Sequence, residues 1–176
     1  MIADSSVIIL FARLNKIGLL KKPYASIEVT ESVYEESVEK GAEYGHGDAA
    51  ILKKAFDEGH LRITKLYGAH KDLSNNLQRA HPQLGKGETD TIALAIQNKT
   101  SVALIDEHPA RIAARLQGVK CTGTVGILLA AFSKGLISKS EAKALFNTLI
   151  RENIRISAAI AAEFYDALER TGKHRK

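Results

Sequence analysis

Acidic side chains recur along this chain at positions from which they could act together. Asp4 follows the apolar opening Met1-Ile2-Ala3, and Asp106 ends the apolar run Val102-Ala103-Leu104-Ile105. Glu36 lies in a short amphipathic stretch, and Glu88 and Asp90 open an apolar, alanine-containing segment. Carboxylates that gather in one place repel each other unless a cation lies between them. These residue types therefore point to a divalent-cation site.

The elements that must position these acids follow a repeated pattern of short apolar run, turn and longer amphipathic run. This pattern predicts strand–helix units around a parallel sheet. We expect strands ending near residue 4 and over 27–29, 61–66, 102–105 and 119–122, with a short element over 16–20. We expect helices over 7–14, 30–40, 48–58, 73–80, 87–98 and 109–116, with Gly41 and Gly59 ending the second and third of them. Ligands of such sheets bind outside the carboxyl ends of the strands, where most of the acids fall.

The sequence after Thr124 predicts helices only. One is expected over 126–133, a second after a Ser138–Glu141 capping box, and a third capped by Ser157. Ile160, Phe164 and Leu168 recur at helical spacing on the third helix, where they would pack on the core or form a protein interface. We therefore predict one domain over 1–176, with an α/β core over 1–123 and a helical layer over 124–176.

Composition narrows the classes of protein. The chain has 176 residues, of which 45% are hydrophobic, with a formal net charge of +5 and a single cysteine, Cys121. One cysteine excludes an internal disulfide and favours a reducing, cytoplasmic setting. No apolar run approaches the roughly 20 residues that span a bilayer, and no signal peptide is recognisable. The positive charge favours a polyanionic partner, and the six histidines lack the spacing of a zinc site.

Three or four carboxylates at one edge of a sheet would bind Mg²⁺ or Mn²⁺, because these hard cations prefer oxygen ligands. A pair of such ions about 4 Å apart is a known device for phosphodiester hydrolysis. A basic surface would attract the polyanionic substrate. Nuclease chemistry is therefore the function that the acids and the charge predict together.

Four short segments contain these acids, namely Ala3-Asp4-Ser5-Ser6-Val7-Ile8, Val33-Tyr34-Glu35-Glu36, Gly87-Glu88-Thr89-Asp90-Thr91-Ile92-Ala93-Leu94-Ala95 and Leu104-Ile105-Asp106-Glu107 with Ala110-Arg111. In their order and spacing they resemble the motifs of one family, the PIN-domain ribonucleases. Two further segments, Gly123-Thr124-Val125-Gly126-Ile127-Leu128-Leu129 and Gly135-Leu136-Ile137, resemble one prokaryotic subgroup of that family, which takes in VapC-like toxins and PIN-domain nucleic acid-binding proteins.

The resemblance implies a three-layer α/β/α sandwich with a central parallel sheet and extra C-terminal helices. It also implies a Mg²⁺- or Mn²⁺-dependent endoribonuclease that leaves a 5′-phosphate and a 3′-hydroxyl. By motif position, the catalytic and metal-binding acids would be Asp4, Glu36, Asp90 and Asp106, supported by Ser6, Glu88 and Glu107. Many relatives are toxins of toxin–antitoxin pairs, so the implied partners are RNA, a small antitoxin protein and a second copy of the chain.

Two choices stay open within these motifs. The third motif offers Glu88 and Asp90, and the sequence does not decide which faces the site. Glu35 and Glu36 are adjacent on a helix and point about 100° apart, so only one can face a metal. We prefer Glu36 because it keeps the three-residue step from Val33.

Arg111 and Arg115 lie one turn apart on a predicted helix, where they would contact phosphate or pair with acids. Two other functions compete with the nuclease. The first is a PIN-like module that holds RNA or protein without cutting it. The second is a phosphatase with an aspartyl intermediate, which usually needs an aspartate where Ser6 stands.

Overall fold

The structure is a computed structural model, which describes residues 1–21, 27–99, 102–152, 154 and 156–173. The described residues form two compact units, Met1–Thr124 and Val125–Lys176. The first contains all of the predicted acidic site residues, and the second contains helices. Each unit is described by itself below.

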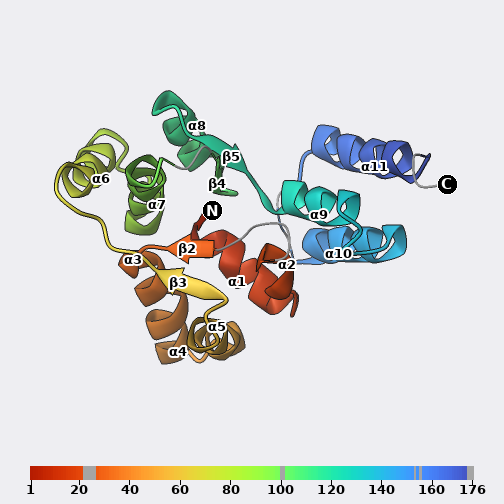
Figure 1. Cartoon of the computed structure of the whole chain (residues 1–176), viewed down its shortest axis with the longest axis horizontal. Helices are drawn as coiled ribbons and strands as arrows, with labels where there is room; N and C mark the ends of the chain where they lie inside the picture. Colours follow the sequence, from red (N-terminus) through yellow and green to blue (C-terminus); the bar gives the residue numbers. More distant parts are fainter. Residues whose placement is uncertain (22–26, 100–101, 153, 155, 174–176) are drawn as a thin grey trace. The chain divides into compact units, whose positions relative to one another are not determined.

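The first unit is built on a five-stranded parallel sheet with the order β3-β2-β1-β4-β5, which Figure 1 shows from β3 to β5. The strands are β1 (Ile2–Ala3), β2 (Ile27–Val29), β3 (Leu61–Ile63), β4 (Val102–Leu104) and β5 (Lys120–Thr122). In the centre, Ala3 pairs with Leu104, so that β1 and β4 end at the same level. Residues that follow these two strands therefore begin at the same edge of the sheet.

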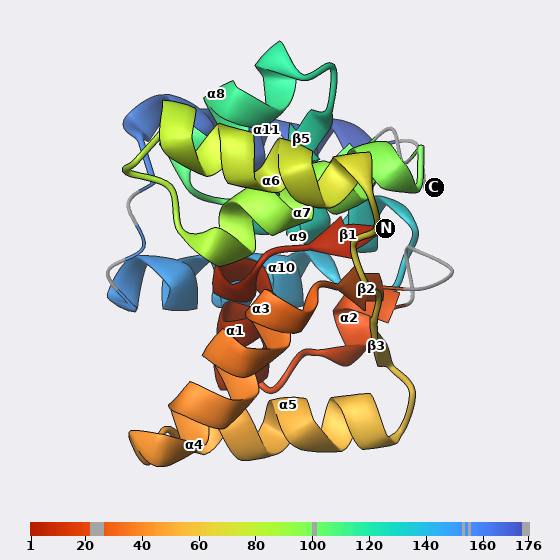
Figure 2. The same cartoon turned by 90° about the vertical axis from the view of Figure 1, so that its left-hand side faces the viewer.

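Helices cover both faces of this sheet and complete a three-layer α/β/α arrangement, as predicted. They are α1 (Ser5–Arg13), α2 (Gly18–Lys21), α3 (Glu31–Tyr34), the π-helix η1 (Glu35–Lys40), α4 (Gly41–Glu43), α5 (Gly47–Asp57), α6 (Ala69–Ala80), α7 (Lys86–Gln97) and α8 (His108–Leu116). Helix α7 packs on β1 and β4 and contacts α3, α6 and α8. Helix α1 packs against α5 and η1. Figure 2 shows α6 and α7 side by side, with α3 next to α7.

A continuous apolar core fixes α7 and α8 on the sheet. Small residues are frequent in it, so the helices approach the strands closely and have little freedom to shift. Its fully buried members include Ile2, Ile92, Leu94, Ala95, Ala103, Ile105, Ala110 and Ala114. The first turn of α7, which carries Glu88 and Asp90, is thereby held against the carboxyl edge of the sheet.

The prediction that Gly41 ends a helix was wrong. The chain continues from α3 through η1 into α4 and leaves the helical conformation only at Tyr44 and Gly45, whose φ is +72°. Gly41 has a helical φ of −57° and lies against the Cβ of Ala49, at 3.1 Å from where its own Cβ would be. Its small size serves the close packing of α4 on α5.

Other boundaries moved by a few residues. The strand predicted over 61–66 is paired only as far as Ile63, and the helix predicted over 73–80 begins earlier, at Ala69. Gly68, with a φ of +48°, turns the chain into this helix. Gly59, with a φ of +68°, follows α5 as expected.

The second unit contains most of α9 (Thr124–Ser133), together with α10 (Lys139–Arg151) and α11 (Ala158–Lys173). The Ser138 hydroxyl accepts the Glu141 N–H, and the Ser157 hydroxyl accepts the Ile160 N–H, so both predicted caps are confirmed. Phe164 of α11 is buried and stacks on Phe146 of α10, with ring centroids 4.1 Å apart. Leu168 is buried too, whereas Ile160 is 43% exposed.

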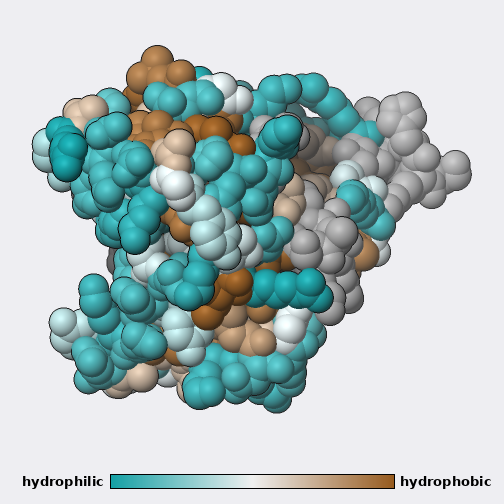
Figure 3. Space-filling view, turned by 60° about the vertical axis from the view of Figure 1, so that its left-hand side comes forward, coloured by the Kyte–Doolittle hydropathy of each residue, from teal (hydrophilic) through white to brown (hydrophobic). Residues whose placement is uncertain are grey.

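None of the described helices is both long and apolar enough to cross a membrane. The face in Figure 3 is mostly hydrophilic, with an apolar patch at the top of the view, where α8 lies. Ile112 and Leu116 of α8 are large exposed apolar residues, one helical turn apart.

Candidate active site

Four carboxylates line one cleft at the carboxyl edge of the sheet. The cleft has a volume of about 340 Å³. Its lining residues are Asp4, Ser5, Ser6, Ile9, Glu36, Gln83, Leu84, Gly85, Glu88, Glu107 and Pro109. All the charged residues in this lining are acidic, and none is lysine, arginine or histidine. We call this region the acidic cleft.

Asp4 is the most buried of the four acids, with 1% of its surface exposed. It follows β1, and its N–H donates to the Leu104 carbonyl at 3.0 Å, which anchors it to β4. Although it occupies the N-cap position of α1, its side chain makes no capping bond. The Ser6 hydroxyl donates to Oδ2 at 3.2 Å, whereas Oδ1 is buried without a hydrogen-bond partner among the described residues.

The pKa of Asp4 is raised from 3.8 to about 7, chiefly because burial removes the hydration of the charged form. The negative charges of Glu88 and Glu36 contribute to the same rise. The nearby Ser5 backbone and the Ser6 hydroxyl favour the charged form and oppose the shift without cancelling it. Near neutral pH, Asp4 is thus a carboxyl group whose ionised form has too little stabilisation from the protein itself.

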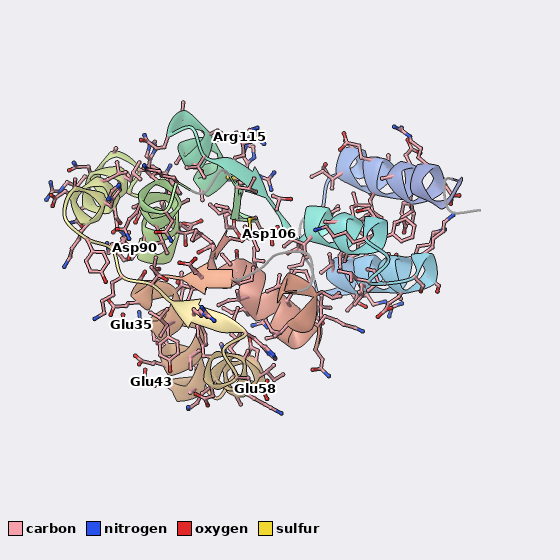
Figure 4. All side chains as sticks on the ribbon, in the orientation of Figure 1. Glu35, Glu43, Glu58, Asp90, Asp106 and Arg115 are labelled. Atoms are coloured by element: carbon pink, nitrogen blue, oxygen red, sulfur yellow. The ribbon has the colours of Figure 1, made fainter. Side chains whose placement is uncertain are left out.

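Glu36 reaches the cleft from η1. A Cβ atom on Gly87 of α7 would lie 3.0 Å from Glu36 Oε2 and 3.6 Å from Asp4 Oδ1. The two carboxylates therefore approach the same point above Gly87, where an added side chain would require the Glu36 carboxylate to shift. Glu35 is exposed and does not line the cleft (Figure 4).

Gly87 was not predicted to belong to the site. One signal in the sequence was available, because a glycine inside a helical pattern lowers helix stability and often has a packing reason.

Glu88 lies in the first turn of α7, and its Oε2 accepts the Gly85 N–H at 2.7 Å. Its second oxygen has no hydrogen bond to the described residues. Burial raises the pKa of Glu88, and the charges of Glu107 and Glu36 raise it further, against the opposing effect of the Gly85 bond. Glu107, at the N-cap position of α8, makes no side-chain capping bond there.

Asp90 points away from the acidic cleft into a polar cluster between α3, α6 and α7, and it is 6% exposed. Its Oδ2 accepts the Ser32 hydroxyl at 2.6 Å, and its Oδ1 accepts the Ser74 hydroxyl and the Lys86 ammonium, the latter at 2.7 Å. Ser32 is also hydrogen-bonded to Thr30, the N-cap residue of α3. We call Thr30, Ser32, Ser74, Lys86 and Asp90 the Asp90 network.

Asp106 also has local partners instead of a place in the cleft lining. Its Oδ1 accepts the Thr124 N–H at 2.8 Å, and its Oδ2 accepts the Thr124 hydroxyl at 2.5 Å. It thus holds the first residue of α9. Figure 4 shows Asp106 beyond β4, apart from Asp90 on α7.

The two arginines predicted to contact phosphate lie outside the cleft lining as well. Arg111 donates to the Ile105 carbonyl at 3.2 Å. Arg115 lines a separate cavity together with Lys120 and Cys121. Burial raises the pKa of the Cys121 thiol, and the charges of the two arginines partly oppose this.

The structure therefore brings together two of the four acids predicted to bind metal, Asp4 and Glu36. Glu88, Glu107 and Ser6, which were predicted to support them, line the same cleft. Asp90 and Asp106 lie outside this lining, and their carboxylates accept hydrogen bonds from serine, lysine and threonine groups. Glu88 and Asp90 are two residues apart on α7 and therefore point in different directions. Glu88 faces the cleft, and Asp90 faces α6.

The cleft residues fit a hard divalent cation in their chemistry. Their charged groups are all carboxylates, and Asp4 Oδ1 is a buried acceptor that the described residues leave unsatisfied. Among the described residues, no three histidine, cysteine, aspartate or glutamate side chains are already arranged to hold a metal ion together. Binding would thus require the flexible glutamate side chains to turn toward Asp4.

Comparison with known proteins agrees with this architecture. A family model described as a PIN domain matches residues 1–170, which is nearly the whole chain. No curated protein matches the chain. The parallel sheet, the acids at its carboxyl edge and the extent of the match assign the chain to the PIN-domain family, whose fold is of the nuclease type.

Proposed function

We propose that this PIN domain is a divalent-metal-dependent endoribonuclease, with the acidic cleft as its active site. The observation that carries the proposal is the buried Oδ1 of Asp4, which has no partner among the described residues and lies in a cleft whose described lining holds four acids and no basic residue. A buried carboxylate oxygen without a partner is unfavourable, and a bound cation would remove that cost. The PIN-domain match adds support, because nuclease chemistry is typical of this fold.

The charge of the cleft limits how RNA can bind there. Phosphate groups are repelled by Asp4, Glu36, Glu88 and Glu107, and no lysine or arginine in the lining offsets this repulsion. A phosphodiester can therefore approach only when cations neutralise these acids. The excess of basic residues elsewhere, which gives the chain its formal charge of +5, would still attract the polyanion over a longer range.

Individual residues have separable roles in this proposal. Asp4, Glu36 and Glu88 would hold the cation, and Ser6 would orient Asp4 through its bond to Oδ2. Glu107 would hold or orient a water molecule at the rim. When bound, Mg²⁺ or Mn²⁺ would lower the pKa of a water and stabilise the negative charge of the leaving oxygen. The hydrolysis adds water across the P–O3′ bond and yields a 5′-phosphate and a 3′-hydroxyl.

Cleavage of single-stranded RNA in Mn²⁺, with and without EDTA, tests this function. We expect EDTA to stop cleavage and Glu36→Gln to reduce it at least about 100-fold, more than the loss of a residue that only orients a ligand. Glu35→Gln is the matched control, because Glu35 is the neighbouring exposed acid outside the cleft, and this variant should cut as wild type does. Cleavage that persists in EDTA would contradict the proposal.

A PIN-like module that binds RNA without cutting is the second candidate. It is favoured by one observation, that no three acidic, histidine or cysteine side chains are arranged for metal binding in the described part of the chain. Binding of RNA by wild type without cleavage in either Mn²⁺ or Mg²⁺ would establish it. The roles of toxin, antitoxin-bound protein and homodimer stay predictions from the family resemblance.

A further inference from the structure

We propose that Asp90 is a positioning residue and not a metal ligand. Together with Lys86, it joins α3 to α7 so that Glu36 and Glu88 face Asp4. This inference rests on the proposed function in one respect, since the cation is what the positioned acids would bind. The hydrogen bonds on which it depends are independent of any metal.

Both oxygens of Asp90 accept hydrogen bonds, and all three protons of Lys86 have acceptors. Asp90 accepts three hydrogen bonds, from Ser32, Ser74 and Lys86. The lysine ammonium has three protons, and it has three acceptors, namely Asp90 at 2.7 Å, the Ser74 hydroxyl at 3.1 Å and Asn75 Oδ1 at 3.4 Å. A metal at Asp90 would have to displace these donors from a carboxylate that is 6% exposed.

The hydroxyl groups of Thr30 and Ser32 donate one after the other toward Asp90. Because Ser32 donates to Asp90, its oxygen must accept the proton of Thr30, 2.9 Å away. The Thr30 oxygen in turn accepts the Val33 N–H and so caps α3. The chain of bonds therefore links the carboxylate on α7 to the first turn of the helix that continues into η1 and Glu36.

The position of Lys86 supports a dedicated role. It is the first residue of α7, where the helix dipole disfavours a positive charge. It also precedes its acidic partner by four residues, the less favourable order for such a pair in a helix. Helix electrostatics therefore do not explain a lysine here. Its bonds to Asp90, Ser74 and Asn75 do, because they fix the turn of α7 that carries Gly87 and Glu88.

The two roles for Asp90 predict opposite effects of removing Lys86. If Asp90 were a ligand, Lys86 would compete with the cation for its oxygen, and Lys86→Met would strengthen Mn²⁺ binding. If Asp90 positions the helices, Lys86→Met loosens the first turn of α7 and weakens Mn²⁺ binding. We expect both Lys86→Met and Asp90→Asn to weaken it by about tenfold, the usual effect of losing a group that orients a metal ligand.

Calorimetric titration of the full chain with Mn²⁺ measures these affinities. Asp48→Asn is the matched control, because Asp48 is also a buried aspartate with a basic partner, Arg13, at 3.1 Å, and it lies outside the acidic cleft. It should destabilise the fold and leave the Mn²⁺ affinity unchanged. Tighter binding by Lys86→Met, or a loss in Asp90→Asn as complete as in Asp4→Asn, would overturn the positioning role.

Amide hydrogen exchange in EDTA separates failure of this inference from failure of the proposed function. Asp90→Asn should speed exchange at the first turns of α3 and α7 selectively, whereas Asp48→Asn should not, even at equal overall stability. If wild type binds no Mn²⁺ and this selective effect is present, the proposed metal site fails and the connection between the helices stands. Unchanged exchange in α3 and α7 would overturn the positioning role whatever the metal result.

Discussion

Asp4 and Asp90 are both buried aspartates at the carboxyl edge of the same sheet, yet their surroundings are opposite in kind. Asp90 has three donors, one of them an ammonium group. Asp4 has three acidic neighbours in its cleft, and its Oδ1 has no hydrogen-bond partner in the part of the chain that the structure describes. Asp90 thus has the Lys86 ammonium as a cationic partner, whereas the charged residues described around Asp4 are all acidic. The difference teaches that burial alone does not single out a metal ligand, and the unsatisfied oxygen among like charges is what favours Asp4 for the proposed role.

The largest contrast is expected in the dependence of stability on pH. The pKa of Asp4 is raised to about 7 in the folded protein from 3.8, so Asp4 favours the folded state at low pH. This contribution is complete below pH 4 and is lost as the pH rises through 7. In EDTA, Asp4→Asn should therefore become more stable than wild type between pH 4 and 8, by a few kcal/mol at most.

Urea unfolding of both proteins at pH 4, 6 and 8 measures this difference. Mn²⁺ should reverse it by stabilising wild type and leaving Asp4→Asn unchanged. A difference between the two proteins that does not vary with pH would show that Asp4 is not held in a destabilised ionised form.

The second prediction concerns the same substitution at the other site. Asp90→Asn should destabilise the protein by about 2 kcal/mol at pH 7, because it removes charge-assisted hydrogen bonds and leaves Lys86 without its carboxylate. Because Lys86 is partly exposed, water limits the cost. Urea unfolding in EDTA is the measurement. Equal signs for Asp4→Asn and Asp90→Asn would remove the contrast between the two sites.

Much of the fold could be predicted from the sequence, because short apolar runs followed by amphipathic segments are local signals. The five strands and most helices are where they were expected. The continuation of the helix through Gly41 was not predictable in this way, since it depends on packing against Ala49 of another helix. In the sequence, Gly41 has the features of a residue that ends a helix. In the fold, it lies within the helix and packs against Ala49.

The acids of the candidate site illustrate the same limit. Asp4 could be located because it directly follows a strand, and the preference for Glu36 over Glu35 matches the lining of the cleft. The places of Asp90 and Asp106 could not be derived, because their partners are distant in sequence. Ser32 is 58 positions from Asp90, and Thr124 is 18 positions from Asp106. Which face of α7 meets the cleft is decided by such contacts.

The smallest expected effect is that of a substitution at Gly87, in the first turn of α7, close to both Glu88 and Asp90. Gly87→Ala would place a Cβ 3.0 Å from Glu36 Oε2 and 3.3 Å from Val33 Cγ2. Alanine favours a helix over glycine by about 1 kcal/mol, and this gain offsets the cost of displacing Glu36 and Val33. Overall stability should therefore change little. Glu36 must move away, so Mn²⁺ affinity should fall several-fold. Unchanged affinity in Gly87→Ala would show that the spacing between η1 and α7 does not set the site.

The central proposal is that Asp4 holds a divalent cation in the acidic cleft, and titration of Mn²⁺ into wild type and Asp4→Asn at pH 7 by calorimetry tests it most directly. We predict saturable binding to wild type and loss of that binding in Asp4→Asn, which remains folded and at least as stable. Equal binding by both proteins, or none by wild type, would contradict the account.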